Sequence, residues 1–310
     1  MPGELNFFQK NARYIVLIAI FIGAFSGIFA RIIDASPMAI GFYRMLFSIP
    51  FFAFPVLISS EKRQIMTHMT KMEWFLSLCA ALSLYGHYMC WFKAVKLTNM
   101  ATAATLESLH PLTVLVISLF LFKRRVGLKA VIGIFLAILG GVIVAMGGSG
   151  VGTLLADQSS LGNFLAFSSS VCLGLYFIFS KVVRDGGLRA DVFIFVIFSM
   201  CGIMFAVTMA ATGDHFTGYS RSDYLYMFAM ALLCQIGAHA LINWAFGYVS
   251  DLYVSTWQTF EGVVTIVLAY FFFAEAPTAV QIIGGFIAFG GLLYYNLNCA
   301  VDWEKPDPDQ

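Results

Sequence analysis

Two apolar stretches of the chain decide its fold. Residues 131–140 read VIGIFLAILG, and residues 282–291, 151 positions later, read IIGGFIAFGG. The similarity extends without a gap over residues 99–144 and 250–295. A repeat of this size, built from segments of membrane length, is typical of transporters that consist of two similar halves. The identical pairs include Thr105/Thr256, Val116/Val267, Phe120/Phe271, Gly133/Gly284, Ala137/Ala288 and Gly140/Gly291.

The composition places the chain in lipid. Hydrophobic residues make up 60% of it and charged residues only 11%, whereas soluble domains carry about 25% charged residues. The six cysteines form no CxxC pair and most lie in apolar runs, so they predict neither a disulfide framework nor a metal site. The phosphate-binding pattern GxxxxGK[ST] is missing, and we therefore expect no cofactor and no nucleotide-driven step within this chain. The basic residues lie in loops, which gives nucleic-acid binding no support.

Apolar runs long enough to cross a bilayer recur along the whole chain. A membrane helix needs about 20 mainly apolar residues. Polar or helix-breaking residues separate the runs, for example Asp34-Ala35-Ser36-Pro37 and Ala276-Pro277. Ten spans are predicted, at about 14–33, 37–58, 74–95, 99–122, 129–147, 161–183, 192–212, 224–247, 252–273 and 278–297.

The positions of Lys and Arg predict the orientation of these spans, since cytoplasmic loops are enriched in both. With the N-terminus inside, thirteen basic residues fall on the cytoplasmic side, and only Arg31, Lys93, Lys96 and Arg221 fall outside. Because each half has five spans, the second half enters the membrane in the opposite direction, giving an inverted repeat. The predicted organisation is a cytoplasmic N-terminal segment (1–13), a first five-helix repeat (14–147), a linker (148–160), a second five-helix repeat (161–297) and a cytoplasmic tail (298–310).

Several short patterns resemble a known family. Phe42-Tyr43-Arg44 lies in the second span, Pro111 lies inside the fourth, and Phe273-Ala274-Glu275 precedes the last. Together with the two sets of five helices, these residues resemble the EamA-type repeat of the drug/metabolite transporter superfamily, over about residues 14–297. One position departs from the family pattern, because Arg124 stands where the first half would match Glu275. The resemblance implies a secondary carrier of small organic metabolites.

Ionisable side chains inside the spans are the main candidates for a binding site, because such groups are costly in lipid and usually face a cavity or a partner. Glu107 and His110 are three residues apart in the fourth span and share a helix face. The repeat places Gln258 and Glu261 at the equivalent positions of the ninth span. We expect these two polar faces to meet near the axis that relates the halves. The alternative is a purely structural hydrogen-bonded pair of helices.

Two further polar stripes occur in the third and eighth spans. His87 and Trp91 are four residues apart, with Tyr88 beside them, and Gln235, His239 and Asn243 repeat the same spacing. Both readings stay open for these residues: they line the cavity, or they are hydrogen-bonded residues of the core. The predicted cavity set from the two stripes is His87, Tyr88, Trp91, His239, Asn243 and Trp244.

Two other residues complete the candidate set. Arg44 is a fixed cation with a planar guanidinium, so it suits a substrate carboxylate, although it equally suits a structural tie to a helix end or a glutamate. Trp257, four residues before Glu261, is a candidate aromatic wall of the site or a packing residue. The glycine patterns Gly23-x-x-x-Gly27, Gly140-Gly141 and Gly284-Gly285 predict close helix contacts.

The favoured function is a secondary, non-ATP-driven transporter of amino acids, amines or drug-like molecules, working by alternating access in the bacterial inner membrane with both termini in the cytoplasm. Its expected partners are a small-molecule substrate, the lipid bilayer and, as one option, protons; both a monomer and a homodimer remain open. One alternative is an intramembrane enzyme that uses Glu107, His110, His87 and Glu261 as acid–base groups on a lipid-soluble substrate. Another is a channel or a structural membrane subunit.

Overall fold

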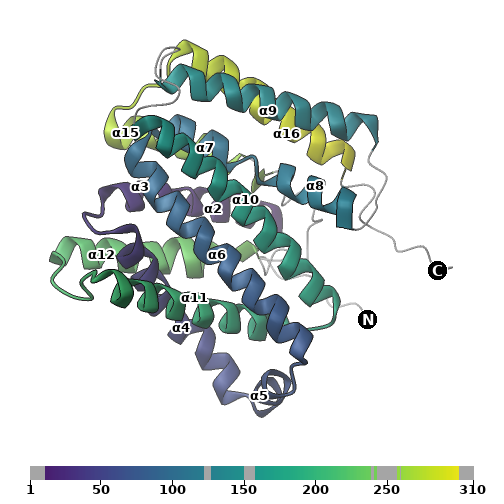
Figure 1. Ribbon diagram of the computed structural model, residues 1–310, viewed down its shortest axis with the longest axis vertical. Coiled ribbons are helices and arrows are strands. Elements are labelled where there is room, and N and C mark those ends of the chain that lie inside the picture. The colour runs from purple at the N-terminus through teal and green to yellow at the C-terminus, as the bar shows by residue number, and fades with distance from the viewer. Residues whose placement is uncertain are drawn as a thin grey trace.

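Helices of the two halves pack together into one body in the computed structural model (Figure 1). It describes residues 11–121, 127–149, 158–238, 241–242, 257–258 and 260–299, and within these ranges no residue is in a strand. The helices are α2 (Ala12–Gly23), α3 (Phe25–Ile32), α4 (Pro37–Ile58), α5 (Ser60–Thr67), α6 (Lys71–Leu97), α7 (Met100–Glu107), α8 (His110–Leu121), α9 (Leu128–Ser149), α10 (Gln158–Asp185), α11 (Ala190–Thr212), α12 (Arg221–Met230), η1 (Ala231–Ala238), α15 (Glu261–Phe273) and α16 (Ala279–Cys299).

The all-helical membrane fold predicted from the sequence is confirmed. In the described part of the chain, seven helical segments are long and apolar enough to cross a membrane, and Val131–Gly147 and Glu261–Phe273 are shorter apolar helices. Many large apolar side chains stay exposed, among them Phe271 at 75% and Phe286 at 78%. Such exposure is costly in water but suits a surface that contacts lipid tails. The end of the eighth predicted span and the start of the ninth lie outside the described residues.

The polar connection after the second span contains a short helix, α5, although this segment has no run of apolar residues. The Ser59 side chain accepts a hydrogen bond from the backbone N–H of Lys62 and so caps the first turn. Glu61 in that turn also favours the positive end of the helix dipole. Capping and charge therefore favour a helix here, and Ile65 and Met66 pack it against the core.

The two halves are joined most extensively by α9 and α16, which lie side by side (Figure 1). Glycines bring the two backbones into direct contact. A Cβ atom on Gly133 would lie 2.8 Å from the carbonyl oxygen of Gly291, and one on Gly291 would lie 2.6 Å from that of Gly133. Gly140 and Gly284 oppose each other in the same reciprocal way. Because these pairs are repeat equivalents, the contact has the geometry of a twofold axis.

Other contacts between the halves obey the same axis. The second span packs on the seventh (α4 on α11), and the fourth packs on the ninth (α7 on α15), so each of these helices contacts its own repeat counterpart. The third span packs on the sixth (α6 on α10), and the equivalent contact joins the eighth to the first (η1 on α2). A pseudo-twofold axis therefore passes between α7 and α15, where the sequence placed its polar pairs.

Three of the predicted spans are interrupted in the described part of the chain. The fourth span divides into α7 and α8 at Ser108-Leu109, and the first divides into α2 and α3 at Ala24. Pro111 explains the break between α7 and α8. Proline has no N–H to donate to the carbonyl of Glu107 four residues earlier, and its ring crowds that carbonyl. The eighth span changes from the α-helix α12 to the π-helix η1 at Ala231. A π-helical turn is costly and is often found at functional sites.

Candidate functional site

The interrupted spans bring Glu107 and Glu261 together. Glu107 is the last residue of α7, and Glu261 is the first residue of α15, after a turn at Phe260. The two carboxyl groups are close enough to interact electrostatically. Both side chains are partly buried. One acidic group from each half is thus presented beside the pseudo-twofold axis.

Small residues allow this close approach. A Cβ atom on Gly262 would lie 2.5 Å from the Ser108 hydroxyl oxygen and 3.2 Å from the Ala104 carbonyl oxygen of α7. On the other side, a Cβ atom on Gly23 of α2 would lie 2.9 Å from Oε1 of Glu261. The glycines therefore let α15 pack against α7 and let the Glu261 carboxyl group rest on α2.

Arg44 of α4 supplies the positive charge of the site. Its side chain is only 4% exposed, and its charge interacts with Glu261. Its Nε donates a hydrogen bond of 2.6 Å to Oε1 of Gln235, and its NH1 donates one of 2.7 Å to the Ser26 hydroxyl. The guanidinium carbon lies 4.6 Å from the centre of the Tyr88 ring, a cation–π distance. Four helices, α3, α4, α6 and η1, therefore hold this cation in one position.

Gln235 was not among the predicted site residues, although its spacing from His239 and Asn243 was noted. It lies in η1 and is completely buried. Its Oε1 accepts hydrogen bonds from Arg44 and from the Tyr88 hydroxyl, the latter at 2.9 Å. Its Nε2 has no hydrogen-bond partner in the part of the chain that the structure describes. The π-helical geometry that places Gln235 here has no signature in the sequence.

His110 begins α8 on the far side of the break from Glu107. Its ring centre lies 5.4 Å from that of Phe177 of α10. The break at Pro111 thus places a carboxyl group at the end of one helix and an imidazole at the start of the next.

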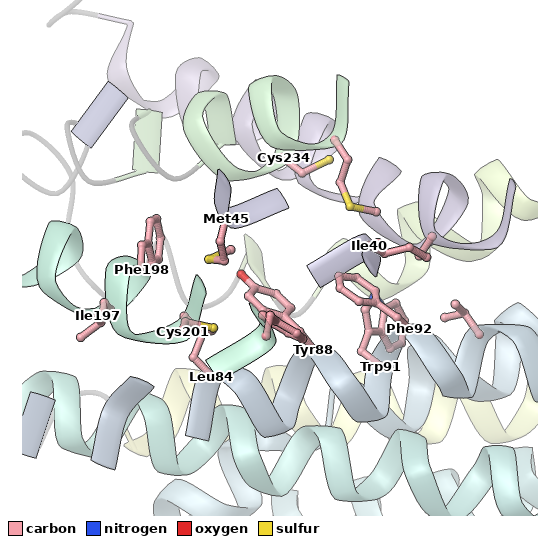
Figure 2. Close-up of a cluster of buried hydrophobic side chains, with 14 of the residues drawn as sticks. Ile40, Met45, Leu84, Tyr88, Trp91, Phe92, Ile197, Phe198, Cys201 and Cys234 are labelled. Atoms are coloured by element: carbon pink, nitrogen blue, oxygen red, sulfur yellow. The ribbon is translucent and has the colours of Figure 1, made fainter. Parts of the chain in front are cut away.

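His87 and Trp91 face other helices of the core. Nδ1 of His87 lies 2.8 Å from the hydroxyl and 3.2 Å from the carbonyl oxygen of Ser169 on α10, so this histidine ties α6 to α10. Trp91 is 7% exposed and packs against Gly27 of α3. Figure 2 shows Tyr88 and Trp91 projecting from α6 into the cluster that also holds Met45, Cys201 and Cys234.

The remaining predicted residues lie along the ninth span or outside the described residues. Trp257 and Gln258 are partly buried, and the ring centre of Trp257 lies 5.5 Å from that of Phe260. In the described part of the chain, no three His, Cys, Asp or Glu side chains are grouped to hold a metal ion. The predicted residues His239, Asn243 and Trp244 fall outside the described residues.

One side of the site is bridged by an ion pair between the halves. Arg31, near the end of α3, contacts Oε1 of Glu275 at 2.6 Å. Oε2 of the same carboxylate accepts a hydrogen bond from the backbone N–H of Met100, the first residue of α7. Gln281 of α16 donates hydrogen bonds to Asn99 and Thr102 nearby. The connection between α15 and α16 is thus bonded to α3 and α7 of the first half. This end of the molecule is the predicted outer side, where Arg31 lies.

Comparison with known proteins identifies the family. The family model described as "EamA-like transporter family" matches residues 12–146 and 160–297, which is most of the chain in two copies. The chain belongs to the EamA-like transporter family. The match confirms the two-repeat, ten-helix membrane fold and makes the protein a membrane transporter.

Individual relatives are more distant. The "Uncharacterized transporter YyaM" of Bacillus subtilis (strain 168) is 28% identical over 106 residues, which are 34% of this chain and 34% of that protein. The chain therefore spans about a third of the length of the curated relative that it matches. A solved structure described as "Crystal structure of protein" has a TM-score of 0.66 and 18% identity, and the match covers 96% of this chain and 99% of that one. At that identity the likeness concerns the fold alone.

Proposed function

We propose that this EamA-like transporter is a secondary carrier that moves small organic metabolites by alternating access, and that Glu107 and Glu261 form its central substrate site. The observation that carries the proposal is the meeting of these two carboxyl groups beside the pseudo-twofold axis, each at an interruption of a membrane helix. Unwound helix ends at the interface of two repeats are where secondary transporters build their sites.

The charges of the site favour a substrate that bears an amine. Two carboxylates accept hydrogen bonds from an ammonium group, and charge-assisted bonds of this kind are stronger than neutral ones. Trp257, four residues before Glu261, is partly exposed and adds an aromatic surface, which attracts cations as well as apolar groups. Amino acids, organic amines and drug-like cations share these features.

Alternating access needs contacts that close one side of the site and can be broken. The ion pair of Arg31 with Glu275 joins the halves at the predicted outer end, and its two side chains are 23% and 27% exposed. Ion pairs at this level of exposure are weak, so they can exchange with solvent during a transport cycle. In this arrangement the predicted outer side is held closed, and the carrier opens when α15 and α16 move away from α3 and α7.

Two driving forces fit the site. In the first, a proton on Glu107 or Glu261 exchanges against the substrate ammonium, with His110 beside Glu107 able to relay it. In the second, the carboxylates only recognise the substrate, which moves down its own gradient. Uphill accumulation in vesicles under an imposed pH gradient, with the membrane potential clamped, supports the first, and its absence supports the second.

The test of the site is counterflow of labelled amines and amino acids in vesicles that contain the purified protein. Glu107→Gln and Glu261→Gln are expected to lower saturable uptake by about tenfold or more, because each removes the charge that pairs with the ammonium. Asp185→Asn at the exposed end of α10, where among the described residues the carboxylate pairs only with Lys181 of the same helix, is the matched control and should leave uptake unchanged. Normal uptake in both site variants would refute the proposal, and recovery of a chemically altered substrate would favour the enzyme alternative.

A further inference from the structure

The geometry points to Gln235 as a substrate-binding residue whose Nε2 donates a hydrogen bond to an acceptor oxygen of the substrate. The inference rests on the proposed carrier function and narrows its substrate class. The ligand that fits carries an ammonium group for Glu107 and Glu261 and, in the same molecule, a carboxylate or carbonyl oxygen for Gln235.

The orientation of the Gln235 amide is fixed by its neighbours. Nε of Arg44 and the Tyr88 hydroxyl both donate to Oε1, at 2.6 Å and 2.9 Å. An arginine has donors only, so rotating the amide would place its NH₂ group against the guanidinium. The Nε2 atom must therefore point away from Arg44.

That nitrogen is left without a partner in a fully buried position. Gln235 has no exposed surface, and among the described residues no hydrogen-bond acceptor reaches Nε2. Buried donors are almost always paired, so an exception requires an explanation such as a ligand that is absent from this state. The donor also lies in a π-helix, a conformation that is itself concentrated at functional sites.

The same neighbours place Gln235 next to the carboxylate pair. Gln235 accepts a hydrogen bond from Arg44, and Arg44 interacts electrostatically with Glu261. The adjacent residue Cys234 also interacts with Glu261 and donates a hydrogen bond to the carbonyl oxygen of Ile22. Gln235 and Glu261 therefore border one small region between η1, α2 and α15. The guanidinium behind the amide favours an anionic acceptor over a neutral one.

A purely structural role does not account for an amide at this position. A glutamate would give both Arg44 and Tyr88 an acceptor oxygen, and its bond to Arg44 would be charge-assisted and stronger. The feature that glutamine adds is the Nε2 donor, which makes no hydrogen bond to the residues that the structure describes. Arg44 and Tyr88 are therefore positioning residues, because their hydrogen bonds to Oε1 set the orientation of the Nε2 donor.

The experiment compares pairs of ligands that differ by one carboxylate. Binding to the purified carrier is measured for 2-phenylethylamine against phenylalanine and for 3-methylbutylamine against leucine. The wild type should prefer the carboxylate-bearing member of each pair. Gln235→Glu keeps the oxygen acceptor but replaces the donor, so the preference should fall by about tenfold to a hundredfold while the amines still bind.

Two further variants separate the binding role from a general disturbance. Tyr88→Phe removes one of the two donors that orient the amide, so it should reduce the preference less than Gln235→Glu does. Gln281→Glu is the matched control, since Gln281 is another buried glutamine but donates to Asn99 and Thr102 instead. It should leave the preference unchanged.

The outcomes distinguish this inference from the carrier function. If the wild type transports amines and amino acids but shows no preference within any pair, Gln235 does not bind the acceptor oxygen of the substrate. This measurement uses the wild type alone, so it does not depend on the folding of any variant. An unchanged preference in a folded Gln235→Glu protein, or an equal loss in Gln281→Glu, also overturns the inference. If no labelled compound undergoes counterflow in the wild type, it is the proposed function that fails.

Discussion

At the scale of single residues, the position of the Glu261 carboxyl group depends on the absence of a side chain at Gly23. A Cβ atom there would lie 2.9 Å from Oε1 of Glu261, closer than real Cβ contacts allow. We expect Gly23→Ala to push the carboxyl group off its rotamer at a cost of about 0.5–1.5 kcal/mol, which weakens substrate binding about two- to tenfold. Gly285→Ala is the control, because nothing lies within 4 Å of its added Cβ atom. Equal ligand affinities in the two variants would contradict this view of Gly23.

The sequence predicted some residues of the candidate site better than others, for reasons of distance along the chain. Glu107 and Glu261 were found because an ionisable group in an apolar span is conspicuous and because the repeat pairs their positions. Gln235 was not found, because its significance depends on Arg44 and Tyr88, which are 191 and 147 residues away. An uncharged amide in a helix gives no sign of which of its atoms will lack a partner.

At the scale of elements, the break between α7 and α8 depends on Pro111. Replacing it by alanine restores an N–H that can bond to the Glu107 carbonyl, so the fourth span should become one continuous helix. We expect Pro111→Ala to raise the thermal midpoint of the purified protein, and to lower uptake because Glu107 and His110 rotate away from their present positions. A variant with unchanged midpoint and uptake would show that the break does not depend on the proline.

The contact between α9 and α16 gives a second prediction at this scale. A Cβ atom on Gly291 would lie 2.6 Å from backbone atoms of Ala137 and Gly133, while one on the neighbouring Gly290 would meet nothing within 4 Å. Gly291→Ala should therefore separate the helices and cost about 1–3 kcal/mol, seen as a lower midpoint of thermal unfolding in detergent. Gly290→Ala is the matched control and should raise or maintain the midpoint, since alanine favours a helix. Equal midpoints for the two variants would contradict the packing of α9 on α16.

The sequence indicated these elements to different degrees. Apolar run length predicted the spans, because every backbone group in lipid must be paired within a helix. The glycine patterns predicted close contacts, and this is confirmed for Gly140 and Gly284 but wrong for Gly285, which has open space around it. The π-helix η1 contains no proline, and its single glycine, Gly237, does not predict a π-turn, because such a turn depends on the packing around the helix.

At the scale of the whole molecule, the pseudo-twofold axis determines which contacts can act together. The contacts of α7 with α15 and of α9 with α16 lie on the axis, so they have no second copy elsewhere. A contact away from the axis can have a repeat equivalent at the opposite end, and a carrier alternates by exchanging one for the other. The equivalent of Glu275 is Arg124, which lies outside the described residues and has the opposite charge. The two ends of the molecule therefore need different contacts to close them.

The ion pair at the Glu275 end gives the last prediction. Glu275→Gln removes the charge that holds Arg31 and weakens the cap on α7, so it should shift the population toward molecules that are open on this side. The measurement uses Thr105→Cys, between Met100 and Glu107 on α7, in a protein whose native cysteines are replaced. An impermeant thiol reagent added outside intact cells should label this cysteine about fivefold faster in Glu275→Gln, which corresponds to about 1 kcal/mol. Equal rates would show that the ion pair does not hold this side closed. Labelling only from the cytoplasmic face of inverted vesicles would show that the orientation predicted from Lys and Arg is wrong.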